Sequence, residues 1–360
     1  LVYNRWHFQG LQMPVADYQQ VLEQNEVVFQ PGLLPEVAHK FDLGLSYSNG
    51  PLDFDVEYFE NTTENFLLPV WQSGDINFRN VATVLNPGWN ISLQYQLGYY
   101  GEFRYNPKIT FQRSRPVVKS ATAGVLPMAG FDNVFTAIAE EQPLGAIYGT
   151  TYQRNAAGEI LIGNDGFPLE NEVPAYLGNP NPDFVLDFSN QFSIGPFKID
   201  WVLEWRHGGS IWNGTQAYLD YQGRSQATAD LRETNGYVFS GVRTDNNTNS
   251  QPVNFADPAL PLSENRWVRY GPYGVGEDYV QQVSWLRLSK LLVGYEFTFP
   301  ANAKIDHLSI NLYANNLFFK SNYEGIAPVN NWMDEVAGRG LDFFNYPMLR
   351  TFGISTTLKF

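Results

Sequence analysis

The sequence predicts an all-β fold, specifically an antiparallel β-barrel that crosses a membrane. Three observations carry this prediction: apolar and polar side chains alternate with a period of two, the alternating segments are long, and short turns alternate with long insertions. A period of two is typical of strands, because successive side chains point to opposite faces of a sheet. A membrane barrel needs this alternation on every strand, with apolar residues toward lipid and polar residues toward the interior.

The alternation is clear in the stretch GISTTLKF that ends the sequence. Phe352, Ile354, Leu358 and Phe360 share one parity, while small or polar residues occupy the other. Such a strand places its apolar side chains in lipid and a large ring at the membrane interface. Similar alternation predicts a hairpin over 41–58 and further strands at about 89–99, 103–111, 184–194, 197–205, 291–299 and 308–312. We count about ten segments of barrel-spanning length.

The predicted connections differ in length on the two sides of the sheet. Short turns are expected at 49–51, 100–101, 195–196 and 300–306. Long extracellular loops are expected at about 61–85, 118–140, 207–282 and 321–345. Outer-membrane barrels have short turns on one side and long loops on the other.

Composition excludes several classes of protein. The net charge of −14 argues against nucleic-acid binding, because phosphate contacts need a basic face. The chain has no cysteine, which excludes disulfides and thiolate metal sites, and no apolar run of eighteen residues. Its start, LVYNRWHFQG, lacks the features of a signal peptide, so we expect that the beginning of the protein has been removed.

A soluble β-sandwich or β-helix is the alternative fold, because its strands also have one wet face. Soluble strands average five or six residues, whereas several segments here reach ten or more. The apolar parity also carries large aromatic residues, which make up 16% of the chain. These two features favour the membrane barrel.

Six stretches resemble SusC-like TonB-dependent transporters of Bacteroidota outer membranes, in the order expected for the C-terminal barrel portion of that family. The stretches run from about Leu33 to Phe360. They are LLPEVAHKFDLGLSYSNGPLDFDVEYFENTTENFLL, PLGAIYGTTYQ, LGNPNPDFVLDFSNQFSIGPFKIDWVLEWRHGGSIWNGT, VSWLRLSKLLVGYEF, LYANNLFF and GLDFFNYPMLRTFGISTTLKF. The third is the most specific, since it joins a Gly-Asn-Pro-Asn-Pro turn to a later Gly-Gly-x-x-aromatic-Asn loop start.

The resemblance implies a plugged barrel of 22 strands, of which this chain supplies a little under half of the wall. The plug, the signal peptide and the segment that couples to TonB are absent from this chain. The implied partners are a SusD-like lipoprotein, TonB through the absent N-terminal part, the remaining barrel and plug, and outer-membrane lipid. Import of an oligosaccharide or oligopeptide is the expected function. Ten strands could also close alone as a small barrel, because an unpaired strand edge is unfavourable in lipid.

Charged side chains on the polar parity are expected to face the barrel lumen. The residues assigned to it are Asp53, Asp55, Glu57, Arg104, Lys108, Lys198, Asp200, Glu204 and Arg206. The three carboxylates at 53, 55 and 57 lie side by side, and glycosidases use such pairs. Wall lining explains them better than catalysis does, so no catalytic residue is assigned.

No metal or cofactor is expected. The four histidines are scattered without an i, i+4 pair, and no nucleotide-binding loop or Gly-x-Ser-x-Gly stretch occurs. Many relatives in the family carry an acidic loop that looks like a calcium site, but the single Asn-Asp-Gly turn at 164–166 lacks the required series of oxygen ligands.

Two insertions contain candidate substrate-binding residues. They are Trp212, Asn213, Tyr218, Asp220 and Tyr221 in the first, and Trp332, Phe343 and Phe344 in the second. Aromatic rings beside polar groups suit sugars or peptides, but the same rings could simply pack a folded loop. A soluble protein that binds or cleaves glycans, and a barrel for assembly or secretion, stay open as alternative functions.

Overall fold

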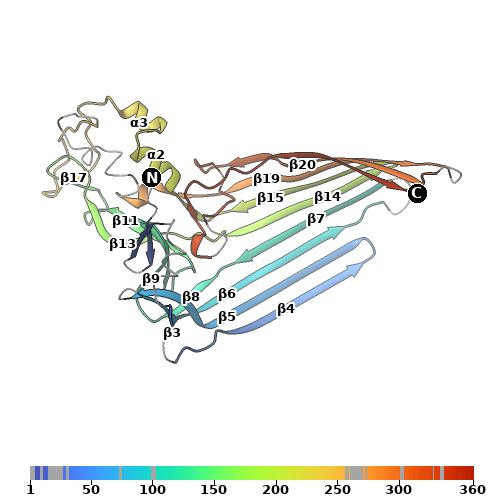
Figure 1. The fold of residues 1–360 in the computed structure, drawn as a ribbon, viewed down its shortest axis with the longest axis horizontal. Helices are drawn as coiled ribbons and strands as arrows, with labels where there is room; N and C mark the ends of the chain where they lie inside the picture. The colour runs from blue at the N-terminus through green and yellow to red at the C-terminus, as the bar shows by residue number, and fades with distance from the viewer. Residues whose placement is uncertain are drawn as a thin grey trace.

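The computed structural model describes residues 32–360, apart from 73–74, 99–102, 256–258, 260–270, 272–273, 301–303, 327 and 333–335, together with three short strands before residue 32. Those strands are β1 (Arg5–Phe8), β2 (Leu11–Pro14) and β3 (Val27–Phe29). The expected turn at 100–101 lies outside the described residues. The described chain consists of a long curved sheet with a smaller folded body at one end (Figure 1).

Nine antiparallel strands follow one another across the sheet in the order β22-β20-β19-β15-β14-β7-β6-β5-β4, and we call these nine the wall. They are β4 (Val37–Asn49), β5 (Leu52–Gln72), β6 (Asp75–Tyr95), β7 (Phe103–Ser114), β14 (Phe184–Ile194), β15 (Phe197–His207), β19 (Trp285–Thr298), β20 (His307–Ser321) and β22 (Thr351–Lys359). Two short strands, β3 and β8 (Val117–Ala121), pair with β6 beside this path. The all-β fold and the strand positions predicted from the alternation are confirmed.

The wall has two chemically different faces, which follow from its cross-strand register. Leu43 lies opposite Tyr58, and Tyr58 lies opposite Trp89, with the last two rings 5.0 Å apart. These residues belong to what we call the apolar face, where Leu43, Leu312 and Ile354 keep 53–70% of their surface exposed. The opposite parity forms the polar face. In a β-sandwich the apolar side chains of one sheet are packed against a second sheet, whereas the apolar side chains of this sheet are exposed.

The wall is open at both edges. Among the described residues, β4 pairs only with β5, and β22 pairs only with β20. The strands lie side by side in a curved sheet that does not close on itself (Figure 1). Each edge therefore presents a row of backbone groups without strand partners.

Two glycines in the wall are covered by aromatic rings from the neighbouring strand. A Cβ atom at Gly88 would lie 2.2 Å from the ring of Phe59, and one at Gly353 would lie 2.3 Å from the ring of Tyr313. The two residues of each pair are direct cross-strand partners. Aromatic cover of a strand glycine protects the ladder and fixes its register.

The segments between the wall strands form a second unit, which we call the loop body. Its strands are β9 (Val125–Gly130), β10 (Val134–Ala139), β11 (Ala146–Tyr152), β12 (Leu161–Ile162), β13 (Glu170–Gly178), β16 (Ser210–Asn213), β17 (Val242–Arg243), β18 (Val280–Gln282) and β21 (Leu341–Asp342). Its helices are α2 (Gly214–Tyr221), α3 (Gln226–Leu231), η3 (Gly276–Tyr279) and η4 (Val336–Gly338). No helix in the described residues is long and apolar enough to cross a membrane.

The hydrophobic core lies in the loop body and at its junction with the wall. One cluster joins Leu68, Val81 and Val84 of the β5–β6 hairpin to Val118 and Ile138. A second surrounds Trp212, and a third surrounds Phe255. The wall itself buries few apolar side chains, which is typical of a sheet whose apolar face is covered by something other than protein.

Two segments expected as long extracellular loops contain regular strands. The ladder of β5 and β6 continues through 61–85 apart from residues 73–74, and 118–140 contains β9 and β10. Burial of both sides of the hairpin end explains why its sequence lacks the simple alternation, and the extracellular position of both segments stays a prediction. The predicted strand in PLGAIYGTTYQ forms as β11, but it belongs to the four-stranded sheet β13-β11-β10-β9 of the loop body and not to the wall.

Candidate functional site

The polar face of the wall brings together all nine residues assigned to the lumen from the sequence. Asp53, Asp55 and Glu57 lie on β5 opposite Gln94, Ser92 and Asn90 of β6. The carboxylates are hydrogen-bonded along this face, since Asn90 Nδ2 donates to Glu57 Oε2 at 2.8 Å and Ser48 Oγ donates to Asp53 Oδ1 at 2.6 Å. Single hydrogen-bonded carboxylates on an accessible face favour wall lining over acid–base catalysis.

The remaining six residues lie on β7 and β15. Arg104 and Lys108 come from β7, while Lys198, Asp200, Glu204 and Arg206 come from β15. Lys198 Nζ lies 3.2 Å from Asp200 Oδ2. Glu204 accepts hydrogen bonds from Arg287, and Arg206 donates to the Pro180 carbonyl oxygen at 3.0 Å.

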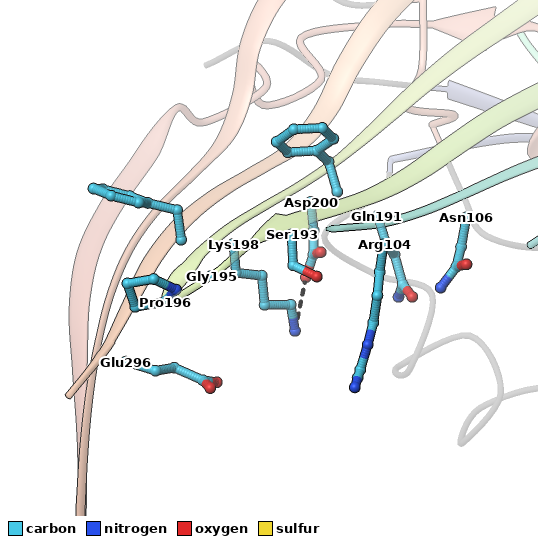
Figure 2. A pocket seen from close by; sticks show the side chains of 11 residues that line it. Arg104, Asn106, Gln191, Ser193, Gly195, Pro196, Lys198, Asp200 and Glu296 are labelled. Carbon is cyan, nitrogen blue, oxygen red and sulfur yellow. Dashed lines mark ion pairs between the residues drawn. The ribbon is translucent and has the colours of Figure 1, made fainter. Parts of the chain in front are cut away.

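Two adjoining cavities open on this face near the β14–β15 turn. One has a volume of about 550 Å³ and is lined by Arg104, Lys198 and Glu296 among others. The other has a volume of about 180 Å³ and reaches Lys108 and Lys290. Both cavities share Asn106, Gln191 and Asp200. Figure 2 shows the side chains of Arg104, Asn106 and Gln191 projecting from the same side of neighbouring strands.

Sequence reasoning missed two cations of the polar face, Arg287 and Lys290. A β-bulge at Ser289 shifts the register of β19 between Leu288 and Lys290 relative to β15. The apolar face therefore takes Leu286 and Leu288 before the bulge and Leu291 and Val293 after it. The spacing of three residues from Leu288 to Leu291, which changes the parity of the apolar residues, was the signal that could have located the bulge.

A polar residue interrupts the apolar face at Asn190 of β14. It is 1% exposed and lies opposite Trp201. Its Oδ1 accepts a hydrogen bond of 2.7 Å from the Tyr105 hydroxyl group, but its Nδ2 has no partner.

The substrate-binding prediction is wrong for the three loop residues that prove to be buried. Trp212 is completely buried and stacks near Phe131 and Phe343, whose ring centroids lie 4.8 and 6.3 Å away. Phe343 is 7% exposed in the same cluster. Asn213 is 1% exposed and caps α2, because its Oδ1 accepts from the Gln216 backbone N–H group. These side chains form the core of the loop body and have no surface for a ligand.

The other five candidates are partly accessible and stay predictions. Tyr218 contacts both Tyr221 and Phe344, with ring centroids 6.3 and 5.4 Å apart. Asp220 accepts hydrogen bonds from Gln216 and from the Tyr279 hydroxyl group.

In the second insertion, Phe344 is 52% exposed and adopts a positive φ of 53°, while its N–H group donates to Thr215. That rare backbone conformation turns its ring outward beside buried Phe343. Trp332 packs at the edge of the same cluster.

A buried polar pair joins the two ends of the second insertion, Tyr323 just after β20 and Asp342 on β21. The Tyr323 hydroxyl group donates to Asp342 Oδ2 at 2.6 Å, and both residues are buried. Burial raises the pKa of Tyr323, and the adjacent carboxylate raises it further. Burial also raises the pKa of Asp342, partly opposed by its hydrogen bonds. The stability that Tyr323 contributes is therefore complete below the ordinary tyrosine pKa of about 10 and is lost as pH rises through the higher pKa of the folded state.

We expect Tyr323→Phe to destabilise the loop body by about 1–3 kcal/mol, because a buried carboxylate oxygen loses its donor. The measurement is hydrogen exchange in the 321–345 segment at neutral pH, with Tyr346→Phe as the control because Tyr346 is 88% exposed. Equal exchange rates in the two variants would show that the pair contributes nothing.

Two curated relatives from Formosa agariphila match most of the chain. TonB-dependent receptor P3 is 23% identical over 363 residues, which cover 90% of this chain and 34% of the relative. TonB-dependent receptor P39 is 24% identical over 386 residues, which cover 89% and 35%. The chain thus spans about a third of the length of the curated relatives it matches. No family model matches it.

Solved structures of the RagAB peptide transporter have a similar fold. One matches with a TM-score of 0.61 and 18% identity, covering 89% of this chain and 35% of that chain. The RagAB peptide importer in the "open-open" state matches with a TM-score of 0.58 and 17% identity, covering 90% and 34%. These similarities confirm that the wall has the fold of part of a larger barrel.

Proposed function

We propose that this chain forms the C-terminal portion of the wall of a SusC-like outer-membrane nutrient importer, a proposal supported by its similarity to two TonB-dependent receptors. The remaining strands, the plug and the TonB-coupling segment would lie in a part of the protein outside this chain. The loop body would then lie on the extracellular side, and the short turns on the periplasmic side.

The observation that supports this proposal is the separation of the two faces over the whole wall. A continuous exposed apolar face is unfavourable in water but suits the hydrocarbon region of a bilayer. The polar face opposite it would line a water-filled interior. A soluble glycan-binding or glycan-cleaving protein would need a second layer over the apolar face, and the described residues supply none.

The open edges support a larger barrel. Backbone groups without partners cost several kcal/mol each in lipid, so β4 and β22 need further strands beside them. The chain's coverage of about a third of its relatives is in keeping with this requirement. Closure of the nine wall strands on themselves is the less favoured arrangement, because β4 and β22 lie apart at opposite edges of the sheet (Figure 1).

The proposed cargo is an oligosaccharide or oligopeptide, delivered with a SusD-like surface lipoprotein and imported with energy from TonB. The similarity to a structure described as a peptide transporter supports small polymers as cargo. The amide, hydroxyl and charged groups on the polar face could hydrogen-bond either kind of chain. No catalytic step is proposed, since the relatives are receptors and transporters.

The test is uptake by the native bacterium. Deletion of the gene that encodes this chain is expected to abolish uptake of at least one fluorescent oligosaccharide or peptide from a panel, and plasmid-borne wild type should restore it. A strain without TonB should show the same defect. Normal uptake of the whole panel together with loss of an exported protein would instead support the assembly or secretion role.

A further inference from the structure

We propose that Arg113 and Arg115, at the loop-body end of β7, bind the phosphate group of a lipid in the extracellular leaflet of the membrane. This inference rests on the proposed membrane position of the wall and adds a specific lipid site to it. Both arginines belong to the apolar face, where its exposed rings and aliphatic chains end. The apolar side chains would contact the acyl chains of the lipid, and the two arginines would contact its headgroup.

The register of β6 and β7 places both arginines on the apolar face. Arg113 lies opposite Trp89, whose ring is exposed on that face. The Arg115 N–H group donates to the Pro87 carbonyl oxygen at 3.0 Å, and β8 then pairs with β6 in the same register. The ladder is therefore continuous past the end of β7, so the arginines occupy successive positions of one face, with Cα atoms roughly 6–7 Å apart.

The arginines also mark the level at which the uncharged part of the apolar face ends. The positions of this face from Phe103 to Phe111 hold only uncharged residues, and the same holds on β14 and on β15 as far as Trp205. The distance from Phe103 to Arg113 is roughly 33 Å along the strand, and a tilt of about 40° reduces it to a height of roughly 25 Å. That height matches the apolar band of outer-membrane barrels, so Arg113 lies at the level of the headgroups.

Aromatic rings on both neighbouring strands support this level. Trp89 of β6 contacts Tyr58 of β5, with ring centroids 5.0 Å apart. On the other side of β7, the ring of Phe184 of β14 lies 5.7 Å from that of Phe111. Tryptophan and tyrosine side chains concentrate at the boundary between lipid and water, where one end of the ring is apolar and the other is wet. The rings and the arginines thus define the same boundary.

The charges of the two arginines are not balanced by neighbouring carboxylates. Neither Arg113 nor Arg115 forms an ion pair or a side-chain hydrogen bond with any described residue. The carboxylates on the same face, Glu60 and Glu64, lie on β5, and β6 separates them from β7. Glu64 Oε2 lies 3.8 Å from His39 Nε2 instead. Strands that are two apart in a sheet are about 10 Å from each other, which is too far for an ion pair.

This surface faces away from the parts of the protein outside this chain. Those parts would continue the sheet beyond its open edges at β4 and β22, or would lie on the polar face. β5 and β6 separate β7 from the open edge at β4, and both neighbours of β7, which are β6 and β14, are present (Figure 1). Lipid is therefore the expected neighbour of the arginines on the apolar face.

A phosphate-bearing lipid fits the pair better than a free phosphate ion does. Guanidinium groups bind phosphate through parallel N–H···O bonds, and two long side chains at adjacent positions can share one phosphate group. Two unpaired cations in a chain with a net charge of −14 also attract an anion. A free ion would gain only these contacts, whereas a lipid also buries its acyl chains against the adjoining apolar face.

The binding test is native mass spectrometry of the full-length protein in detergent, with bisphosphorylated lipid A as the probe. Arg113→Gln together with Arg115→Gln should weaken lipid A binding on the order of tenfold or more, because charge-assisted hydrogen bonds to phosphate are lost. The matched control is Lys40→Gln, which removes a cation near the same end of the wall but on the polar face of β4, and it should leave the affinity unchanged. Heat-modifiable migration in gels shows that each variant is folded.

Three results would overturn the proposal. The first is equal affinity for lipid A in the wild type and the double variant, or an equal loss in Lys40→Gln. The second is equal affinity of the wild type for lipid A from which both phosphate groups have been removed, since apolar contact alone would then hold the lipid. The third is displacement of lipid A by an equal concentration of inorganic phosphate, which would assign the arginines to a free anion.

Insertion into lipid vesicles separates failure of this inference from failure of the proposed function. If the wild type inserts but the double variant binds lipid A equally well, the membrane wall stands and the lipid site does not. If the protein needs no detergent and does not insert, the membrane position fails, and the lipid site fails with it. Insertion, together with phosphate-dependent binding that is lost in the double variant and kept in Lys40→Gln, supports both.

Discussion

Leu312→Arg is expected to prevent or strongly reduce folding of the protein into membranes, whereas Asn311→Arg on the same strand is expected to be tolerated. Leu312 lies near the middle of β20 on the apolar face and is 53% exposed. An arginine that faces lipid at the bilayer midplane costs about 2–4 kcal/mol. Asn311 has the opposite parity and would present the same charge to the polar face.

The measurement is the fraction of full-length protein that shows heat-modifiable migration after insertion into lipid vesicles. The two variants differ by one position in sequence and carry the same substitution, so the comparison isolates the direction of the side chain. Equal yields for both variants, or recovery of both as proteins that need no detergent, would contradict a lipid-facing apolar side of the wall.

The second large effect is expected for Trp212→Ala in the loop body. Trp212 is fully buried in one cluster with Phe131 and Phe343, and removal of a buried tryptophan costs about 3–5 kcal/mol because it leaves a cavity. The loop body should become sensitive to protease, while the wall keeps its heat-modifiable migration, because the wall is held by backbone ladders that Trp212 does not contact.

Phe344→Ala is the matched control for this prediction. Phe344 adjoins Phe343 in sequence but is 52% exposed, so its removal should change the stability of the loop body by less than about 1 kcal/mol. Protease resistance in Trp212→Ala equal to that of wild type would show that the aromatic cluster is not the core of this unit. Loss of the wall in the same variant would show that the two units fold together.

Site residues could be predicted from the sequence in the wall, where the strands form regular ladders, but not in the two insertions. Charges such as Lys108 and Asp200 were assigned to one face because strand parity fixes the direction of a side chain wherever the ladder is regular. Trp212 and Phe344 have similar local sequence signals, rings beside polar residues, yet one is buried and the other exposed. Parity carries no information in an insertion whose segments pack in three dimensions.

The sequence by itself determined the strands of the wall, their two faces and the family resemblance, because each depends on neighbours a few residues apart. Only the tertiary structure decided that 61–85 extends as a paired hairpin, that β11 leaves the wall, and that the bulge at Ser289 turns Lys290 toward the polar face. It also decided that Arg104, Lys198 and Lys290 share one surface, although they are far apart in the chain. Pairing between distant strands sets these features, and that pairing is governed by burial and register over the whole sheet rather than by local periodicity.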